Sequence, residues 1–136
     1  MKDDLQRFVD AQSRVLDHVR QELKAGRKTS HWMWFIFPQI KGLGHSATAK
    51  RYAIADLEEA RAYLAHPILG PRLIECTRAV LHLKDKPLTE IFGTPDDLKF
   101  RSSMTLFAHA SDNPAFREAL TCFCGGEEDA ETVKRL

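Results

Sequence analysis

One segment combines aromatic rings with polar and cationic side chains, the residue types that line small-molecule pockets. Trp32 and Trp34 are the two tryptophans of the chain, and Gln39 and Lys41 follow a few positions later. An aromatic ring can stack on a planar group while a cation meets a phosphate. His31 precedes the tryptophans and could titrate in an apolar pocket. We therefore expect ligand-facing side chains in this segment.

The same aromatic residues also suit a hydrophobic core, which is their commoner role. The apolar run from Trp32 to Phe37 is too continuous to form one stripe of a helix. Such a segment must be buried on all sides, or some of its rings must face a cavity. We expect Trp34 or Trp32 to line a cavity and most of the neighbouring rings to pack in the core.

A second polar group stands in the helix predicted after Thr94. Helical periodicity places Lys99, Ser102 and Ser103 on one face. Lysine supplies a point charge and the serines supply donors, a combination that suits a phosphate or carboxylate. The alternative is a solvated helix face with small residues where another helix crosses, and this is the more common arrangement.

A glycine-rich loop adds a third candidate for anion binding. Lys41 stands next to Gly42, and Gly44 follows ahead of a helix start predicted at Ser46. Backbone N–H groups in such a loop could cradle an anion. No strand precedes the loop as dinucleotide-binding and Walker motifs require, so a plain turn is the alternative. Arg51 adds a further cation in the helix that follows.

The sequence predicts no metal site and no cofactor. Its histidines form no His-x-x-x-His pair, and the Cys122–Cys124 spacing lacks the second cysteine pair of a zinc site. No Ser-His-Asp order or nucleophile elbow is present, so no catalytic residue is assigned. An odd number of cysteines, three in all, favours a reducing compartment.

Composition narrows the classes of partner. The chain has 136 residues, the size of one domain, which we place at 1–136. Its 20 Lys and Arg residues against 19 Asp and Glu give a net charge of +1, which disfavours nucleic-acid binding. The start lacks the apolar region of a signal peptide, and no apolar run reaches the ~18 residues of a membrane span. We expect a cytoplasmic protein that does not bind a membrane.

Helical periodicity dominates the chain. An apolar stripe from Leu5 to Leu23 predicts one long N-terminal helix, with Asp3 or Asp4 as its cap and Gly26 as its stop. Further starts are predicted at Ser30, Ser46, Asp56, Leu69, Pro87, Thr94, Asn113 and Asp129, and ends at Pro38, about Ile54, His66, Leu83, Gly93 and Phe123. No useful strand pattern appears. The predicted fold is all-α, a compact domain of about six to seven helices.

Several long strings resemble one bacterial family, the domain of unknown function 1810. They are SHWMWFIFPQIKGLG from residue 30, RYAI from residue 51, HPILGPRL from residue 66, FG from residue 92, DDLKFRSSMTLF from residue 96 and GGEED from residue 125. They cover nearly the whole chain in order. The resemblance implies a single, mainly helical domain and carries no activity that can be transferred.

A second set of positions is similar to the NAD- and ADP-ribose-associated (NADAR) families. These run from Arg51 and Tyr52, past the His66-Pro67 break, to the segment that starts at Asn113. That similarity implies a helical N-glycosidase acting on ADP-ribose-type or ribosylated substrates. The glutamate that these families carry shortly before the tyrosine is absent, since Ala49 and Lys50 stand there. Ligand binding is therefore implied more directly than the same chemistry.

Together these features favour a domain that binds a small phosphorylated or nucleotide-like molecule, such as an ADP-ribose-like ligand, and that could hydrolyse an N-glycosidic bond. The alternative is a non-enzymatic interaction module, such as a homodimer, whose aromatic residues lie in the core or an interface. The candidate ligand-binding residues are His31, Trp32, Trp34, Gln39, Lys41, Arg51, Lys99, Ser102 and Ser103.

Overall fold

The long N-terminal helix, α1 (Gln6–Ala25), follows from its apolar stripe. The computed structural model describes residues 5–136, so Asp3 and Asp4, the predicted caps of this helix, lie outside the described residues. Gly26 ends α1 in the left-handed conformation (φ 80°), as predicted from its position. The stripe buries Phe8, Ala11, Gln12, Leu16, Val19 and Leu23.

Within residues 5–136 the structure contains nine helices and no strand, which confirms the all-α prediction. After α1 come α2 (Met33–Ile36), α3 (Ala47–Arg51), α4 (Leu57–Ala65), α5 (Leu69–Leu81), α6 (Leu88–Phe92), α7 (Asp96–Ala110), α8 (Pro114–Cys124) and α9 (Ala130–Lys134). The count exceeds the predicted six to seven because α2, α3, α6 and α9 are single turns of four or five residues.

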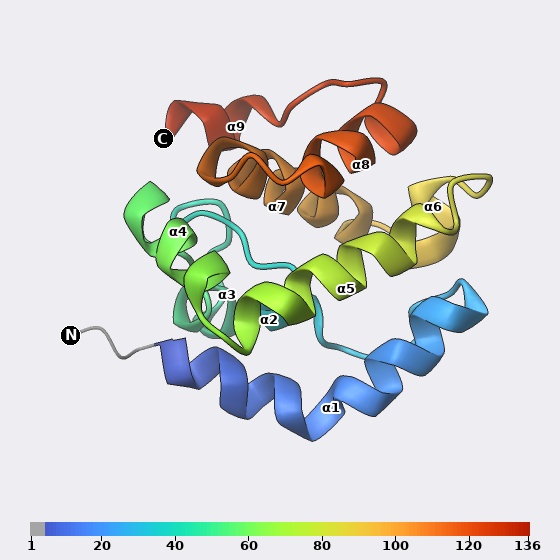
Figure 1. Ribbon diagram of the computed structural model, residues 1–136, viewed down its shortest axis with the longest axis horizontal. Helices are drawn as coiled ribbons and strands as arrows, with labels where there is room; N and C mark the ends of the chain where they lie inside the picture. Colours follow the sequence, from blue (N-terminus) through green and yellow to red (C-terminus); the bar gives the residue numbers. More distant parts are fainter. Residues whose placement is uncertain (1–4) are drawn as a thin grey trace.

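The helices are arranged around α7. In Figure 1, α1 runs along one edge of the molecule, α7, α8 and α9 lie toward the opposite edge, and α5 crosses between them. α7 packs against α8, α4, α6, α9 and α2. Its buried Phe100 contacts the rings of Phe37 and Phe92 at the centre of the core. None of the described helices is both long enough and apolar enough to cross a membrane.

Four predicted caps are present. The side chains of Ser46, Asp56, Asn113 and Asp129 each accept a hydrogen bond from a backbone N–H in the first turn of the helix that follows. Because these residues fix where the chain turns into a helix, they also place the side chains of the loops between helices.

Helix α3 stops at Arg51, short of the predicted end near Ile54. The reason is a single parallel bridge between Ile40 and Ile54. Ile54 N–H donates to Gln39 O at 2.9 Å, and Lys41 N–H donates to Ile54 O at 2.8 Å. These hydrogen bonds hold Ile54 in an extended conformation and close the loop between the two positions.

Two predicted caps were wrong. Helix α2 begins after Trp32 without a side-chain cap, since the hydroxyl of Ser30 donates to Glu22 instead. Helix α7 begins after Pro95, and the hydroxyl of Thr94 does not cap it. Both helices bury residues in the core, Met33 and Ile36 in α2 and Phe100, Met104 and Phe107 among those in α7.

Candidate functional site

Trp32 belongs to the core. Its side chain is 0% exposed and its ring contacts Phe37 and Phe92. The indole Nε1 donates to Glu22 Oε1 at 3.0 Å, which satisfies the one polar atom of the side chain. Trp32 is therefore a core residue and lines neither of the two cavities described below.

Glu22 is the acceptor that fixes the loop between α1 and α2. Besides the indole, its carboxylate accepts the backbone N–H groups of Thr29 at 2.7 Å and Ser30 at 3.1 Å. Burial acts to raise the pKa of Glu22, but the donors from Ser30, Thr29 and Trp32 outweigh it and lower the pKa to about 2. The carboxylate is thus charged and structural.

Trp34 is the tryptophan that lines a cavity. We call this space the Trp34 cavity. Its volume is about 10 Å³, room for about one water molecule. The lining residues are Trp34, Gln39, Ile40, Gly44, Ala49, Tyr52 and Ala53. Lys99 Nζ lies 5.2 Å from the centre of the Trp34 ring and covers it. In this conformation the Trp34 cavity has no room for a planar ring.

A larger cavity lies on the other side of Gly44 and Ala53, which line both spaces. Its volume is about 440 Å³, within the range of ligand pockets. We call it the basic cavity; it is lined by Arg7, Lys41, Gly42, Gly44, His45, Lys50, Ala53, Ala55 and Glu59.

The elements that place these side chains come from distant parts of the sequence. The Ile40–Ile54 bridge holds Lys41 at the start of the glycine-rich loop. The Ser46 cap then starts α3, which carries Lys50, and α1 brings Arg7 to the same space. The predicted anion-binding loop therefore forms one wall of a cavity.

In the wall of the basic cavity, Arg7 and Glu59 contact each other and the backbone of the turn after α3. Arg7 Nε donates to Arg51 O at 2.6 Å, and Nη2 donates to Ala53 O at 2.9 Å. Glu59 Oε1 lies 3.9 Å from Arg7 Nη2 and accepts the backbone N–H of Ala55 at 2.8 Å. These contacts close the turn between α3 and α4 beside the cavity.

Lys41 and Lys50 are the two cations of the lining that are free to contact a ligand. Both are exposed, and within residues 5–136 neither forms an ion pair. With His45 neutral, the three cations Arg7, Lys41 and Lys50 against one carboxylate, Glu59, give the lining a net charge of +2. A phosphate monoester carries about −1.5 to −2 at neutral pH, so the charges are complementary.

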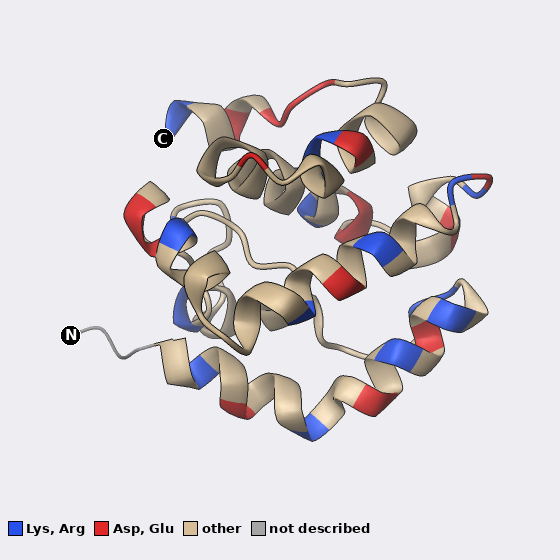
Figure 2. Cartoon of the chain, viewed as in Figure 1, with Lys and Arg blue, Asp and Glu red and all other residues tan. Residues whose placement is uncertain are grey.

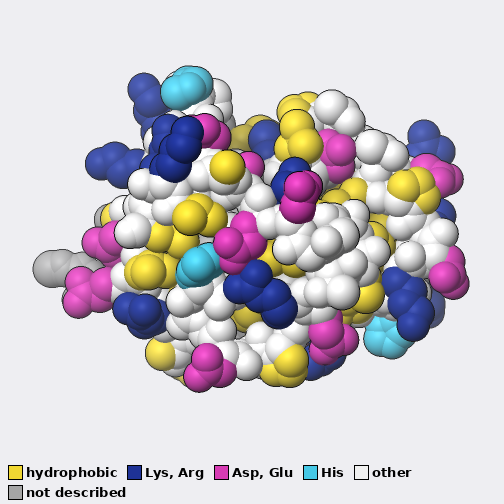
Figure 3. All heavy atoms as spheres, turned by 90° about the horizontal axis from the view of Figure 1, so that it is seen from above, with side chains coloured by type: hydrophobic (Ala, Val, Ile, Leu, Met, Phe, Trp, Pro, Cys, Tyr) yellow, Lys and Arg dark blue, Asp and Glu magenta, His cyan; other side chains and the backbone are white. Residues whose placement is uncertain are grey.

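Gly42 has a conformation that few other residues adopt, with φ of 102°. A Cβ at this position would also lie 2.8 Å from Arg135 Nε, so the C-terminal segment packs against the loop of the basic cavity. On the face drawn in Figure 3, acidic and basic side chains are interspersed, although one group of Lys, Arg and His gathers at the upper left.

Other predicted site residues lie apart from this space. His31 is exposed and lines neither cavity. Arg51 is exposed, and its guanidinium lies 5.6 Å from the centre of the Tyr52 ring, while its carbonyl anchors Arg7. Of the nine candidates, the structure brings Trp34, Gln39 and Lys99 together and places Lys41 in the adjoining basic cavity.

The predicted face of Lys99, Ser102 and Ser103 is not an open surface. Ser102 is 5% exposed and Ser103 0% exposed, because α7 is covered on several sides. The Ser102 hydroxyl lies 3.1 Å from both Leu98 O and Asp129 Oδ2, and the Ser103 hydroxyl has no partner in the described part of the chain. These serines face α9 and the core, while Lys99 turns to Trp34.

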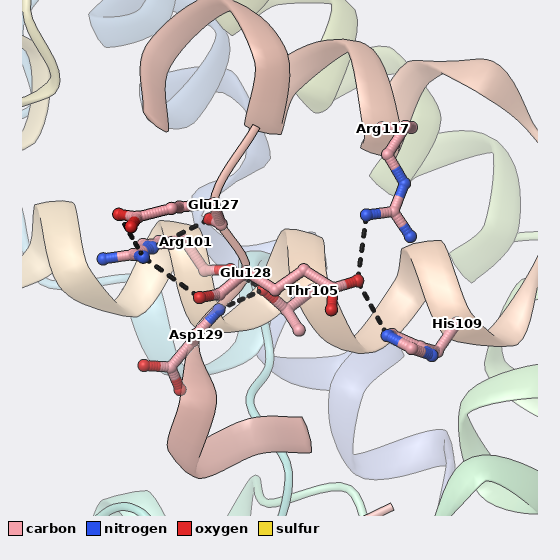
Figure 4. A network of polar contacts seen from close by, with 7 residues as sticks. All are labelled: Arg101, Thr105, His109, Arg117, Glu127, Glu128 and Asp129. Atoms are coloured by element: carbon pink, nitrogen blue, oxygen red, sulfur yellow. Dashed lines mark hydrogen bonds and ion pairs between the residues drawn. The ribbon is translucent and has the colours of Figure 1, made fainter. Parts of the chain in front are cut away.

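Ser102 takes part in a clamp that holds the C-terminal segment on α7. Figure 4 shows other members of this clamp, Arg101 and Thr105 of α7 with residues 127–129. Arg101 donates to Glu127 O and Glu128 O, both at 3.0 Å. Asp129 N–H donates to the hydroxyl of Thr105 at 2.9 Å. This clamp places α9, which brings Arg135 to the loop of the basic cavity.

Sequence patterns had missed Arg7, His45, Lys50 and Glu59 as lining residues. The sequence could have indicated Lys50 as a lining residue, because it lies in the helix that Ser46 caps, directly after the glycine-rich loop. Arg7 and Glu59 gave none, since they lie in helices whose spatial position the sequence does not specify.

Comparison with known proteins supports the fold. A family model described as "Protein of unknown function (DUF1810)" matches residues 2–136. The chain is similar to the crystal structure of the conserved hypothetical protein Rv1873 from Mycobacterium tuberculosis, with 57% sequence identity and a TM-score of 0.96. The similarity covers 98% of this chain and 96% of that one. No curated protein matches the chain significantly.

Proposed function

The chain belongs to the DUF1810 family, as its motifs predicted, and from the geometry of the basic cavity we propose that it binds a small phosphorylated molecule. One observation carries this proposal. Lys41 and Lys50 line the same space of about 440 Å³, and neither has an acidic partner within residues 5–136. Two lysines without an ion-pair partner in this described part of the chain, beside a glycine-rich loop, suit a phosphate group.

The size of the two cavities narrows the class of ligand. The Trp34 cavity is too small to stack a base, and Lys99 covers that ring. The basic cavity has room for a sugar phosphate or a compact nucleotide, with the phosphate between Lys41 and Lys50. An ADP-ribose-like ligand would place one phosphate there and leave its remaining groups over the rim.

Binding can be tested by thermal unfolding and calorimetry with inorganic phosphate, ribose 5-phosphate, AMP and ADP-ribose, with ribose as the uncharged control. We expect phosphorylated compounds to raise Tm and ribose to leave it unchanged. The variant Lys41→Ala/Lys50→Ala should weaken binding by about tenfold or more, because it removes both unpaired cations. Lys84→Ala, an exposed lysine elsewhere, is the matched control. Equal binding to the double variant, or no Tm change with any phosphorylated compound at millimolar concentration, would refute the proposal.

Within this proposal, hydrolysis of an N-glycosidic bond is the reaction to test first. Water would attack the anomeric carbon and give up a proton, to a carboxylate or to solvent, as the glycosidic C–N bond breaks. From NAD, nicotinamide would leave as the neutral base with the electron pair of that bond. Glu59 is the carboxylate among the residues that line the basic cavity, so it is the group to vary. Chromatography of NAD incubated with the protein and with Glu59→Gln would show whether free nicotinamide appears. Release by the protein and loss in the variant would support hydrolysis, whereas binding without release would restrict the function to binding.

A further inference from the structure

A second cavity of ligand size lies between α1 and α5, away from the basic cavity. Its volume is about 370 Å³. We call it the α1–α5 groove; it is lined by Arg20, Leu23, Lys24, Glu75, Cys76, Ala79, His82 and Leu83. It shares no lining residue with the basic cavity.

The floor of the groove is apolar. Leu23 and Cys76 are buried at its base, and Ala79 and Leu83 are partly exposed along it. The space exists because α5 presents the small side chains of Cys76 and Ala79 toward α1, where a longer side chain would fill it. Burial raises the pKa of the Cys76 thiol to about 12, so the sulfur is a neutral part of this floor.

The rim of the groove is basic. Arg20 is neutralised by Glu75, since its Nε and Nη2 donate to the two carboxylate oxygens at 2.7 and 3.1 Å. Lys24 is exposed and forms no ion pair within residues 5–136. His82 donates from Nδ1 to Arg78 O at 2.9 Å, because a carbonyl can only accept, and this leaves its Nε2 without a partner in the same part of the chain.

A further lysine, Lys86, lies where α1 stops, near Leu83 but outside the residues that line the groove. Lys86 Nζ donates to Gly26 O at 3.1 Å, and a Cβ at Gly26 would lie 3.4 Å from Leu83 Cδ2. In Figure 2, basic positions are coloured blue at the C-terminal end of α1 and in the loop after α5, where an acidic position lies among them. The groove thus combines an apolar floor with the ammonium group of Lys24 on its rim.

We propose that the α1–α5 groove binds a small amphipathic carboxylate, with an alkyl or aryl body on Leu23, Ala79 and Leu83 and its carboxylate toward Lys24. Burial of the apolar body supplies the affinity, and the unpaired ammonium selects an anion over a neutral or cationic head group. The site is independent of the phosphate proposal because the two cavities are separate.

Octanoate is the probe, with octan-1-ol and octylammonium as ligands of matched chain length. Titrations followed by two-dimensional 15N NMR should show saturable shifts at Leu23, Ala79 and Leu83 with octanoate at millimolar concentration. Octan-1-ol should bind about threefold to tenfold more weakly and octylammonium more weakly still. Lys24→Glu, a surface change, should reduce octanoate affinity by a similar factor and leave octan-1-ol binding unchanged.

Two further variants separate the groove from other surfaces. Ala79→Leu should fill the groove and abolish the shifts, with circular dichroism reporting that the fold is kept. Lys50→Glu, in the basic cavity, should leave octanoate binding unchanged. Non-saturable shifts spread over the molecule, equal affinity for octanoate and octan-1-ol, or full binding to Lys24→Glu would each overturn the proposal.

Discussion

Lys28 and Asp96 form an ion pair that is almost closed to solvent, with Lys28 Nζ 2.7 Å from Asp96 Oδ2 and the lysine side chain 7% exposed. It joins the loop after α1 to the first turn of α7. Lys28 Nζ also lies 5.2 Å from the centre of the Trp32 ring, and the other oxygen of Asp96 lies 3.6 Å from Lys99 Nζ. One carboxylate therefore holds two lysines, each of which covers one tryptophan.

Removing one partner of this pair should destabilise the protein strongly. Among the described residues, Lys28→Ala leaves Asp96 with the longer contact to Lys99, so we expect a loss of about 2 to 4 kcal/mol in the free energy of unfolding. Urea unfolding measures this loss. Lys24→Ala, an exposed lysine in the last turn of α1, should cost under about 0.5 kcal/mol. Similar losses in the two variants would contradict the importance of the buried pair.

Glu22 should make stability depend on pH in the acid range. Its pKa is lowered from 4.5 to about 2 on folding, so the folded state favours the charged form. The resulting stabilisation is complete above 4.5 and is lost as the pH falls from 4.5 through about 2. Glu22→Gln should therefore cost about 2 to 3 kcal/mol at neutral pH, because four donors lose a charged acceptor.

The measurement is the difference in unfolding free energy between the protein and Glu22→Gln at several pH values. That difference should shrink below pH 4.5. Glu58→Gln is the control, because Glu58 is exposed in the first turn of α4. A difference that stays constant down to the lowest pH would show that the charge of Glu22 is not what holds the loop.

The contrast between Trp32 and Trp34 shows what the sequence could specify. The apolar run predicted that most of its rings would be buried, and the cap and glycine signals at Ser46, Asp56 and Gly26 placed helix ends correctly. Those features depend on local chemistry. Which tryptophan would face a cavity depends on the donor position of one indole relative to Glu22, a contact that crosses a turn and follows no local pattern.

The serines of α7 show what the sequence could not specify. Helical periodicity placed Lys99 and Ser102 within one turn of each other but could not predict that the C-terminal segment would cover Ser102. The basic cavity was equally hidden, because Arg7 and Lys50 line one space through the packing of α1 against the turn that follows α3. Long-range packing decided both cases.

The C-terminal clamp should depend on Arg101 more than on Arg117. Arg101 binds two backbone carbonyls and its side chain is 29% exposed, whereas Arg117 forms an ion pair with Glu128 and is 51% exposed. Arg101→Ala should cost about 1.5 to 3 kcal/mol, and Arg117→Ala under about 1 kcal/mol. Hydrogen exchange of residues 127–136 should rise in the first variant and change little in the second. Equal exchange in both would show that the backbone contacts do not hold this segment.

Gly70→Ala gives the sharpest test of packing, because helix propensity predicts an increase in stability and the packing of α4 against α5 predicts a decrease. Replacing glycine by alanine inside a helix normally stabilises by about 1 kcal/mol. Here Gly70 lies in the first turn of α5, and a Cβ would stand 2.1 Å from Leu64 O in α4, which is backbone and cannot move aside. Gly70→Ala should therefore destabilise the protein by about 2 kcal/mol or more, seen as a lower urea midpoint.

Ala62→Gly, at an exposed position of α4, is the control and should cost about 1 kcal/mol, as propensity alone requires. An increase in stability for Gly70→Ala would mean that α4 and α5 can separate without cost, and the close approach of the two helices would then not be a constraint of the fold.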